Sequence, residues 1–159
     1  MHNGRFFRQK QGTTIGTEMA PPYGILFLAD LEENFLDSND QNPLVWWRYI
    51  DDIFMIWEHG KEALEEFLTK LNQCHPTIKF TAEYSDKSVN FLDVNVIPDG
   101  NRLITDLYVK PTDTHQYLHS TSCHAYHTKK AIPYSQALRL NRICSENKFF
   151  DQRCNELEA

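Results

Sequence analysis

Apolar positions recur with a helical period in three parts of this chain. Between Tyr23 and Leu36 they return every three or four residues, which predicts an amphipathic helix. A more regular stripe follows, and His75-Pro76 ends it. Its apolar members are Leu64, Phe67, Leu68 and Leu71. A third helix is expected from Ser135 to Ser145, where Arg139 and Arg142 are three residues apart and therefore lie near one another.

Elsewhere the apolar positions alternate with polar ones, which predicts strands. From Ile78 to Tyr84 every second residue is apolar, as is typical of a half-buried strand. Another alternation begins at Leu92, and Pro98-Asp99-Gly100 turns the chain into Leu103–Val109, so these residues predict a hairpin. Together the helices and strands indicate an α+β fold.

The longest stretch of apolar, β-branched and aromatic residues runs from Leu44 to Trp57 and contains Asp51-Asp52 near its middle. Runs of this composition predict two buried strands, with the aspartate pair at the bend between them. Trp46, Trp47 and Trp57 are therefore expected in the core. Two adjacent carboxylates are costly to bury unless a cation neutralises them, and Mg²⁺ is commonly held by one or two carboxylates plus substrate phosphates. From charge alone, a simple hydrophilic turn explains the pair equally well.

The charge of the chain is unevenly distributed. Its 159 residues suffice for one domain with a hydrophobic core, and the net charge of −6 argues against a surface that is basic throughout. Residues 102–148 carry seven Lys or Arg and three Asp or Glu, which leaves a charge of −10 for the rest. This asymmetry fits an acidic catalytic part followed by a basic part that contacts an anionic polymer, although ordinary surface variation also produces such differences.

Cysteine usage and hydropathy indicate an intracellular protein, nuclear or cytoplasmic. The four cysteines form no Cys-x-x-Cys pair, and the N-terminus has no secretory signal, so we expect reduced thiols. The longest apolar run, Gly24 to Leu31, is too short to cross a membrane. The sequence leaves the oligomeric state open.

The first residues predict an interrupted structural unit. Asn3-Gly4 is a hairpin signal, yet only two residues precede it, so we expect the chain to begin partway through a unit. The segment from Gln9 to Gly16 is rich in Gly and Thr, which suits close approach of the backbone to a ligand.

These features resemble known sequence blocks. Gln11–Pro22, followed by Trp47–Asp52 with its Tyr-Ile-Asp-Asp motif, resembles the B and C blocks of reverse transcriptases. The segments His75–Thr81, Asn90–Val94 and Thr105–Ser145 are similar to the reverse transcriptases of Penelope-like retroelements, and the resemblance covers nearly the whole chain. It implies a partial polymerase palm over residues 1–109 and the start of a helical thumb, truncated, over residues 110–159.

The resemblance implies RNA-directed DNA polymerase chemistry, with an RNA template, a DNA primer and dNTPs as partners and Mg²⁺ or Mn²⁺ as cofactor. Asp51 and Asp52 would hold the catalytic metal ions. Nucleotide addition is an in-line phosphoryl transfer in which two metal ions about 3.5–4 Å apart stabilise the attacking and leaving oxygens. Nucleotide or template contacts would come from Gln11, Gly12, Thr13, Tyr49 and Lys79. Contacts to the nucleic-acid backbone would come from Lys110, Lys129, Lys130, Arg139 and Arg142, and the hairpin from Asn90 to Val109 would grip the primer.

The chain departs from the family pattern at one essential position. Reverse transcriptases need a further aspartate in an A block upstream of the Gly-rich segment, and none of the residues there is acidic. We therefore expect this chain to be inactive alone, with an exposed sheet edge that promotes aggregation. The alternative is a non-catalytic retroelement remnant that binds nucleic acid. A zinc site is a weaker hypothesis than nucleic-acid contacts, because the spacing is unlike that of a standard finger. Its candidate ligands are His115, His119, Cys123, His124 and His127.

Overall fold

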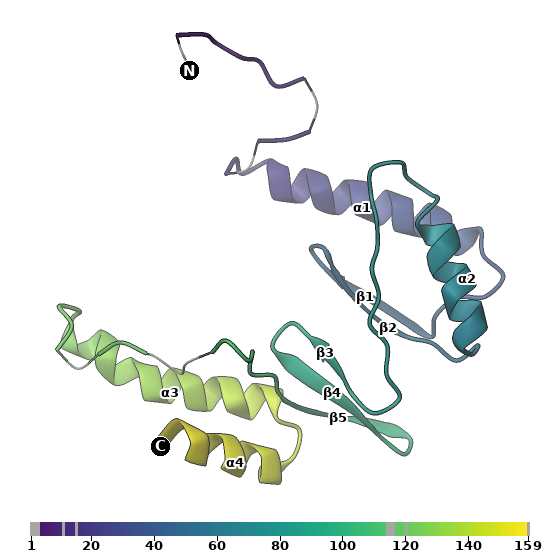
Figure 1. Cartoon of the computed structure of the whole chain (residues 1–159). Coiled ribbons are helices and arrows are strands. Elements are labelled where there is room, and N and C mark those ends of the chain that lie inside the picture. Colours follow the sequence, from purple (N-terminus) through teal and green to yellow (C-terminus); the bar gives the residue numbers. More distant parts are fainter. Residues whose placement is uncertain (1–3, 11, 15, 114–116, 120, 159) are drawn as a thin grey trace. The chain divides into compact units, whose positions relative to one another are not determined.

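The computed structural model describes residues 4–10, 12–14, 16–113, 117–119 and 121–158 (Figure 1). The chain divides into two compact units, an N-terminal unit (Met1–Thr81) and a C-terminal unit (Ala82–Ala159). The described residues form four helices and two small antiparallel sheets, which confirms the α+β class. The palm–thumb boundary after residue 109 concerns function and stays a prediction.

In the N-terminal unit two helices flank a hairpin. Helix α1 spans Ala20–Asp37, strands β1 and β2 span Val45–Tyr49 and Asp52–Ile56, and helix α2 spans Lys61–Leu71. Helix α1 begins three residues before the predicted Tyr23 because its two prolines occupy the first turn, where a backbone N–H has no helical partner. The hairpin predicted around Asp51-Asp52 is confirmed.

The core of this unit lies where α1 and α2 meet the hairpin. Phe35, Phe67 and Leu71 are buried, and Trp46, Met55 and Trp57 pack against them. The Phe67 ring is the centre of this cluster, with ring centroids of Phe35 at 5.0 Å and of Trp57 at 4.9 Å. The predicted apolar stripe of α2 is thus confirmed, as is the placement of Trp46 and Trp57 against the core.

The prediction that Trp47 lies in the core is wrong, since 64% of its surface is exposed. Neighbouring residues of a strand point to opposite faces of the sheet. Trp46 faces the buried cluster, so Trp47 lies on the other face of the hairpin. The apolar character of β1 therefore does not mean burial on both faces.

The prediction of a strand from Ile78 to Tyr84 is also wrong, since the described structure has no strand there. The Asn72 amide just after α2 takes the place of a strand partner at Phe80: its Nδ2 donates to the Phe80 carbonyl at 2.9 Å, and its Oδ1 accepts from the Phe80 N–H at 2.7 Å. Beyond Phe80 the apolar members of the alternation are exposed, Tyr84 by 49%. Alternation without a neighbouring strand gives only extended chain.

The C-terminal unit joins a three-stranded sheet to a pair of helices. Its strands β3 (Val89–Phe91), β4 (Val94–Asp99) and β5 (Arg102–Leu107) pair in chain order. The predicted hairpin corresponds to β4 and β5. Leu92 does not begin a strand as expected, because it occupies a two-residue turn with φ of 56° between β3 and β4.

Helices α3 (Tyr126–Ile143) and α4 (Asn147–Glu158) pack on one another and on β5. Figure 1 shows α4 running back beside α3. Helix α3 begins nine residues before the predicted Ser135, because it continues through Pro133. An interior proline costs about 3 kcal/mol, and packing of the buried Leu140 helps to offset it. Sequence reasoning missed α4, although its partly buried residues (Phe150, Arg153, Cys154 and Leu157) follow a helical period.

Candidate functional site

The tip of the β1–β2 hairpin carries the candidate site. The strand register runs from Val45 opposite Ile56 to Tyr49 opposite Asp52, so Ile50 and Asp51 form a two-residue turn. Asp51 and Asp52 are exposed, and Tyr49 is 58% exposed directly across from Asp52. The structure thus brings three of the predicted site residues together at one exposed tip.

Ile50, the first turn residue, has a strained backbone. Its φ of 57° lies in the left-handed region, where β-branched side chains are rarely found. Holding such a residue there costs on the order of 1–3 kcal/mol, and it persists only where the surroundings impose it. A hairpin turn selected for ease of folding would place Gly or Asn at this position.

Arg48 supplies the restraint on this turn. Its Nη1 donates to the Ile50 carbonyl at 3.1 Å, its Nη2 to the Ile25 carbonyl of α1 at 3.2 Å, and its Nε to Glu32 Oε2 at 2.8 Å. The Arg48 and Glu32 side chains are only 11% and 9% exposed. One guanidinium therefore ties helix α1 to the carbonyl beside Asp51.

Sequence reasoning missed this ion pair. Glu32 of helix α1 is one of the few buried charged residues in the described part of the chain. Its second oxygen, Oε1, has no hydrogen-bond partner among the described residues, so Arg48 carries most of the compensation for this buried carboxylate. A lone arginine inside an otherwise apolar strand was the available signal, because such a cation needs a buried anion.

The other predicted nucleotide-site residues do not join this tip. Gly12 and Thr13 precede α1 and are exposed, Gly12 with φ of 76°, and Gln11 lies outside the described residues. Lys79 Nζ donates to the Asn72 carbonyl at 2.7 Å. Between described residues, no hydrogen bond connects any of them to the hairpin tip.

The donor set at the tip fits a hard divalent cation bound jointly with a substrate. Two carboxylates at one exposed turn match the one or two that usually hold Mg²⁺ beside phosphate oxygens. Among the described residues, no group of three or more His, Cys, Asp or Glu is placed to hold a metal ion. The zinc hypothesis gains no support, and His115 lies outside the described residues.

The predicted backbone-binding cations fall into two groups. Arg139 donates through Nη2 to Asp93 Oδ2 at 2.8 Å, which links α3 to the β3–β4 turn, and Lys129 is half-buried. Lys130 and Arg142 on α3, like Lys110, are exposed and have no ion pair with a described residue.

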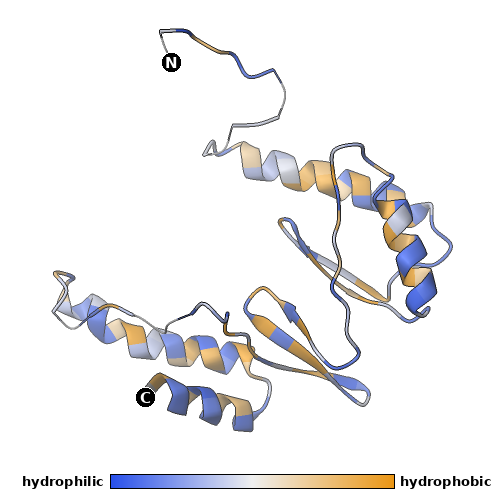
Figure 2. Cartoon of the chain, in the orientation of Figure 1, coloured by the Kyte–Doolittle hydropathy of each residue, from blue (hydrophilic) through white to orange (hydrophobic). Residues whose placement is uncertain are grey.

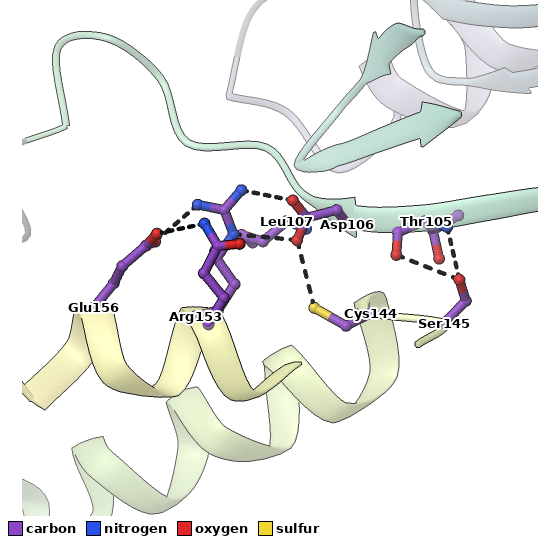
Figure 3. A network of polar contacts seen from close by, with 8 residues as sticks. Thr105, Asp106, Leu107, Cys144, Ser145, Arg153 and Glu156 are labelled. Carbon is purple, nitrogen blue, oxygen red and sulfur yellow. Dashed lines mark hydrogen bonds and ion pairs between the residues drawn. The ribbon is translucent and has the colours of Figure 1, made fainter. Parts of the chain in front are cut away.

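A second buried ion pair holds α4 to the sheet (Figure 3). Arg153 Nη2 and Asp106 Oδ2 are 2.6 Å apart, with side chains 20% and 7% exposed. The hydrogen bond to Asp106 raises the pKa of Arg153, and hydrogen bonds from Gln152 and Arg153 lower the pKa of Glu156. Burial raises the pKa of the neighbouring Cys144 thiol. This pair anchors α4 to β5.

The α3–α4 turn is also attached to β5. The Thr105 N–H donates to Ser145 Oγ at 2.8 Å, and the Ser145 N–H donates to the Thr105 carbonyl at 3.0 Å. Arg102 bridges Asp99 and Glu146, at 2.9 Å from each. Helix pair and sheet therefore form one structural body.

A family model described as an animal helix-turn-helix domain matches residues 116–159. The match covers both C-terminal helices and the three-residue turn between them, a little over a quarter of the chain. No curated protein and no solved structure matches the chain. None of the helices in the described part of the chain is both long and apolar enough to span a membrane.

Proposed function

We propose that this chain is part of an RNA-directed DNA polymerase of a Penelope-like retroelement, with Asp51 and Asp52 as its metal-binding carboxylates. The observation that carries the proposal is the exposed carboxylate pair on a strained turn that Arg48 holds in place. The Gly-rich segment and the Tyr-Ile-Asp-Asp motif, in that order, add sequence support.

The geometry of the hairpin tip suits a site whose carboxylates must be held in fixed positions. Nucleotidyl transfer depends mostly on positioning and on electrostatic stabilisation of phosphate charge, and Mg²⁺ or Mn²⁺ bound at these carboxylates would supply that stabilisation. A short hairpin presents both carboxylates, and the Arg48–Glu32 pair fixes the backbone beneath them. Tyr49, across from Asp52, is available to contact a primer end or nucleotide.

The alternative of a simple hydrophilic turn explains less. A solvated turn needs neither a strained isoleucine nor a buried arginine bound to its carbonyl. Strained backbone that the surroundings maintain clusters at active sites, ligand clamps and switch regions. These features favour a functional tip over a neutral loop.

The proposal includes inactivity of the chain by itself. A two-metal polymerase site needs an additional aspartate, and the residues before the Gly-rich segment contain no acidic side chain. Asp51 and Asp52 would then bind metal weakly and become effective only together with a third carboxylate from elsewhere.

Two measurements on the purified chain test this proposal. Binding of Mn²⁺, followed by electron paramagnetic resonance, should be weak in wild type, lost in Asp51→Asn and retained in Asp86→Asn, a control at an exposed turn in the other unit. Equal binding by all three proteins would exclude the metal site. Primer extension on an RNA template should be absent, and extension that disappears in Asp51→Asn would refute the inactivity but support the carboxylate role.

A non-catalytic remnant that binds nucleic acid is the second candidate. The helix-turn-helix match and the absence of acidic residues from α3 favour it, because two-helix motifs of this class commonly dock on nucleic acid. Both candidates place nucleic acid on this chain, in the nucleus or cytoplasm. They differ in whether the Asp51 carboxylate contributes to the function by binding a metal ion.

A further inference from the structure

One row of side chains on α3 is exposed along its whole length. It consists of every fourth residue, which places its members side by side as a ridge on the helix surface. We name this set the α3 ridge: Tyr126, Lys130, Tyr134, Leu138 and Arg142. Tyr126 is 78% exposed and Tyr134 69%, and both cations are exposed.

Packing of the opposite side fixes the direction in which this ridge faces. Ile132, Gln136, Leu140 and Cys144 also follow four-residue spacing, and they are all buried or half-buried, with Leu140 only 2% exposed. Arg139, next to the ridge, is held by Asp93 at 2.8 Å. The α3 ridge is therefore a preformed outer surface of the C-terminal unit.

The two helices differ in the charge that they offer to a partner. Residues 126–143 contain four Lys or Arg and no Asp or Glu, whereas residues 147–158 contain two basic and three acidic residues. Of the two basic residues of α4, Arg153 pairs with Asp106, and Lys148 pairs with Glu146 at 3.0 Å. Figure 2 shows α4 as largely hydrophilic, but its net charge is −1 and both of its basic side chains are already paired with carboxylates.

We propose that the α3 ridge binds single-stranded nucleic acid, with phosphates at Lys130 and Arg142 and an unpaired base stacked on Tyr134. The inference rests on the nucleic-acid-binding part of the proposed function and is independent of catalysis. In this proposal helix α4 makes no contact with the nucleic acid. This differs from DNA-binding helix-turn-helix domains, in which the second helix enters the major groove.

The alternation of cations and aromatic rings favours a single strand. An aromatic side chain stacks on a base only when that base is unpaired, and a basic groove or stripe follows the backbone without reading sequence. Lys130 and Arg142 are twelve residues apart, about 18 Å along the helix axis. A strand lying along α3 can therefore contact both cations with Tyr134 between them.

Fluorescence anisotropy with the whole chain tests this inference, using labelled oligo(dT) and a DNA duplex of equal length. Removing two phosphate contacts by Lys130→Ala with Arg142→Ala should weaken oligo(dT) binding about tenfold and reduce the salt slope by about 1.4. Tyr134→Ala should weaken oligo(dT) binding about tenfold and leave the salt slope unchanged. Tyr134→Phe keeps the aromatic ring and should bind oligo(dT) as wild type does. Lys148→Ala, on α4, is the matched control and should bind as wild type does.

The outcomes separate this inference from the polymerase proposal. Asp51→Asn should leave oligo(dT) binding unchanged, so failure of the metal site would not affect the result. A Lys148→Ala loss equal to that of the double variant would overturn the assignment to α3. So would oligo(dT) binding that does not respond to Tyr134→Ala, a preference for duplex over oligo(dT), or absence of oligonucleotide binding.

Discussion

Removing Arg48 gives the sharpest test of how the hairpin tip is held. Arg48→Met keeps the length and apolar stem of the side chain but deletes the guanidinium. The change leaves the buried Glu32 carboxylate without its cation and the Ile50 and Ile25 carbonyls without the guanidinium donor. The Ile25 carbonyl keeps the N–H donor that lies four residues on in α1, so the loss falls mainly on Glu32 and on the Ile50 carbonyl.

The expected cost follows from burial of the pair. With both side chains about nine-tenths buried, removing one partner of such a pair costs about 3–5 kcal/mol, because the other charge stays desolvated and unpaired. Whole domains are stable by only about 5–15 kcal/mol. Arg48→Met should therefore remove a large part of the free energy of unfolding of the N-terminal unit.

Urea unfolding followed by tryptophan fluorescence measures this loss, because all three tryptophans lie in the N-terminal unit. The double variant Arg48→Met with Glu32→Leu should recover most of the stability, since no buried charge remains. It should not recover Mn²⁺ binding, because the Ile50 carbonyl still lacks its donor.

Lys70→Met is the control, because it breaks an exposed ion pair in the same unit and should shift the unfolding midpoint little. An Arg48→Met midpoint no lower than that of Lys70→Met would refute the reasoning. A double variant no more stable than the single one would show that the loss comes from packing rather than from the unpaired carboxylate.

Two predictions concern the C-terminal unit. Asp106→Asn should destabilise it by about 3 kcal/mol in urea unfolding followed by circular dichroism, near the lower end for a broken buried pair because its arginine partner is partly exposed. Asp99→Asn, in an exposed pair, should have little effect, and equal effects would contradict the role assigned to burial. Burial raises the pKa of Cys144 in the folded state. The free energy of unfolding of the C-terminal unit should therefore be highest below the unfolded thiol pKa of about 8.5, and it should fall as the pH rises through the folded pKa. The pH dependence should be smaller in Cys144→Ala, and iodoacetamide should label the exposed Cys74 faster than Cys144 at pH 8; equal labelling rates would count against the raised pKa.

Much of the fold could be predicted because it depends on local periodicity. The apolar stripe of α2 and the hairpin around Asp51 each follow from the repeat of a single element and from the turn within it. The predictions were wrong where a neighbour decides the outcome. Alternation over Ile78–Tyr84 does not form a strand, because the Asn72 side chain, not another strand, bonds Phe80.

The sequence by itself determined the candidate chemistry: two adjacent carboxylates at a bend between apolar strands, and a basic segment after them. Only the tertiary structure decided which cations hold the fold and which remain available to a ligand. Arg48 and Arg153 pair with carboxylates 16 and 47 residues away, whereas Lys130 and Arg142 have no such partner among the described residues. The physical reason is that a charge is stabilised by whatever packing brings within a few ångströms of it, and the residues next to it in sequence do not specify that packing.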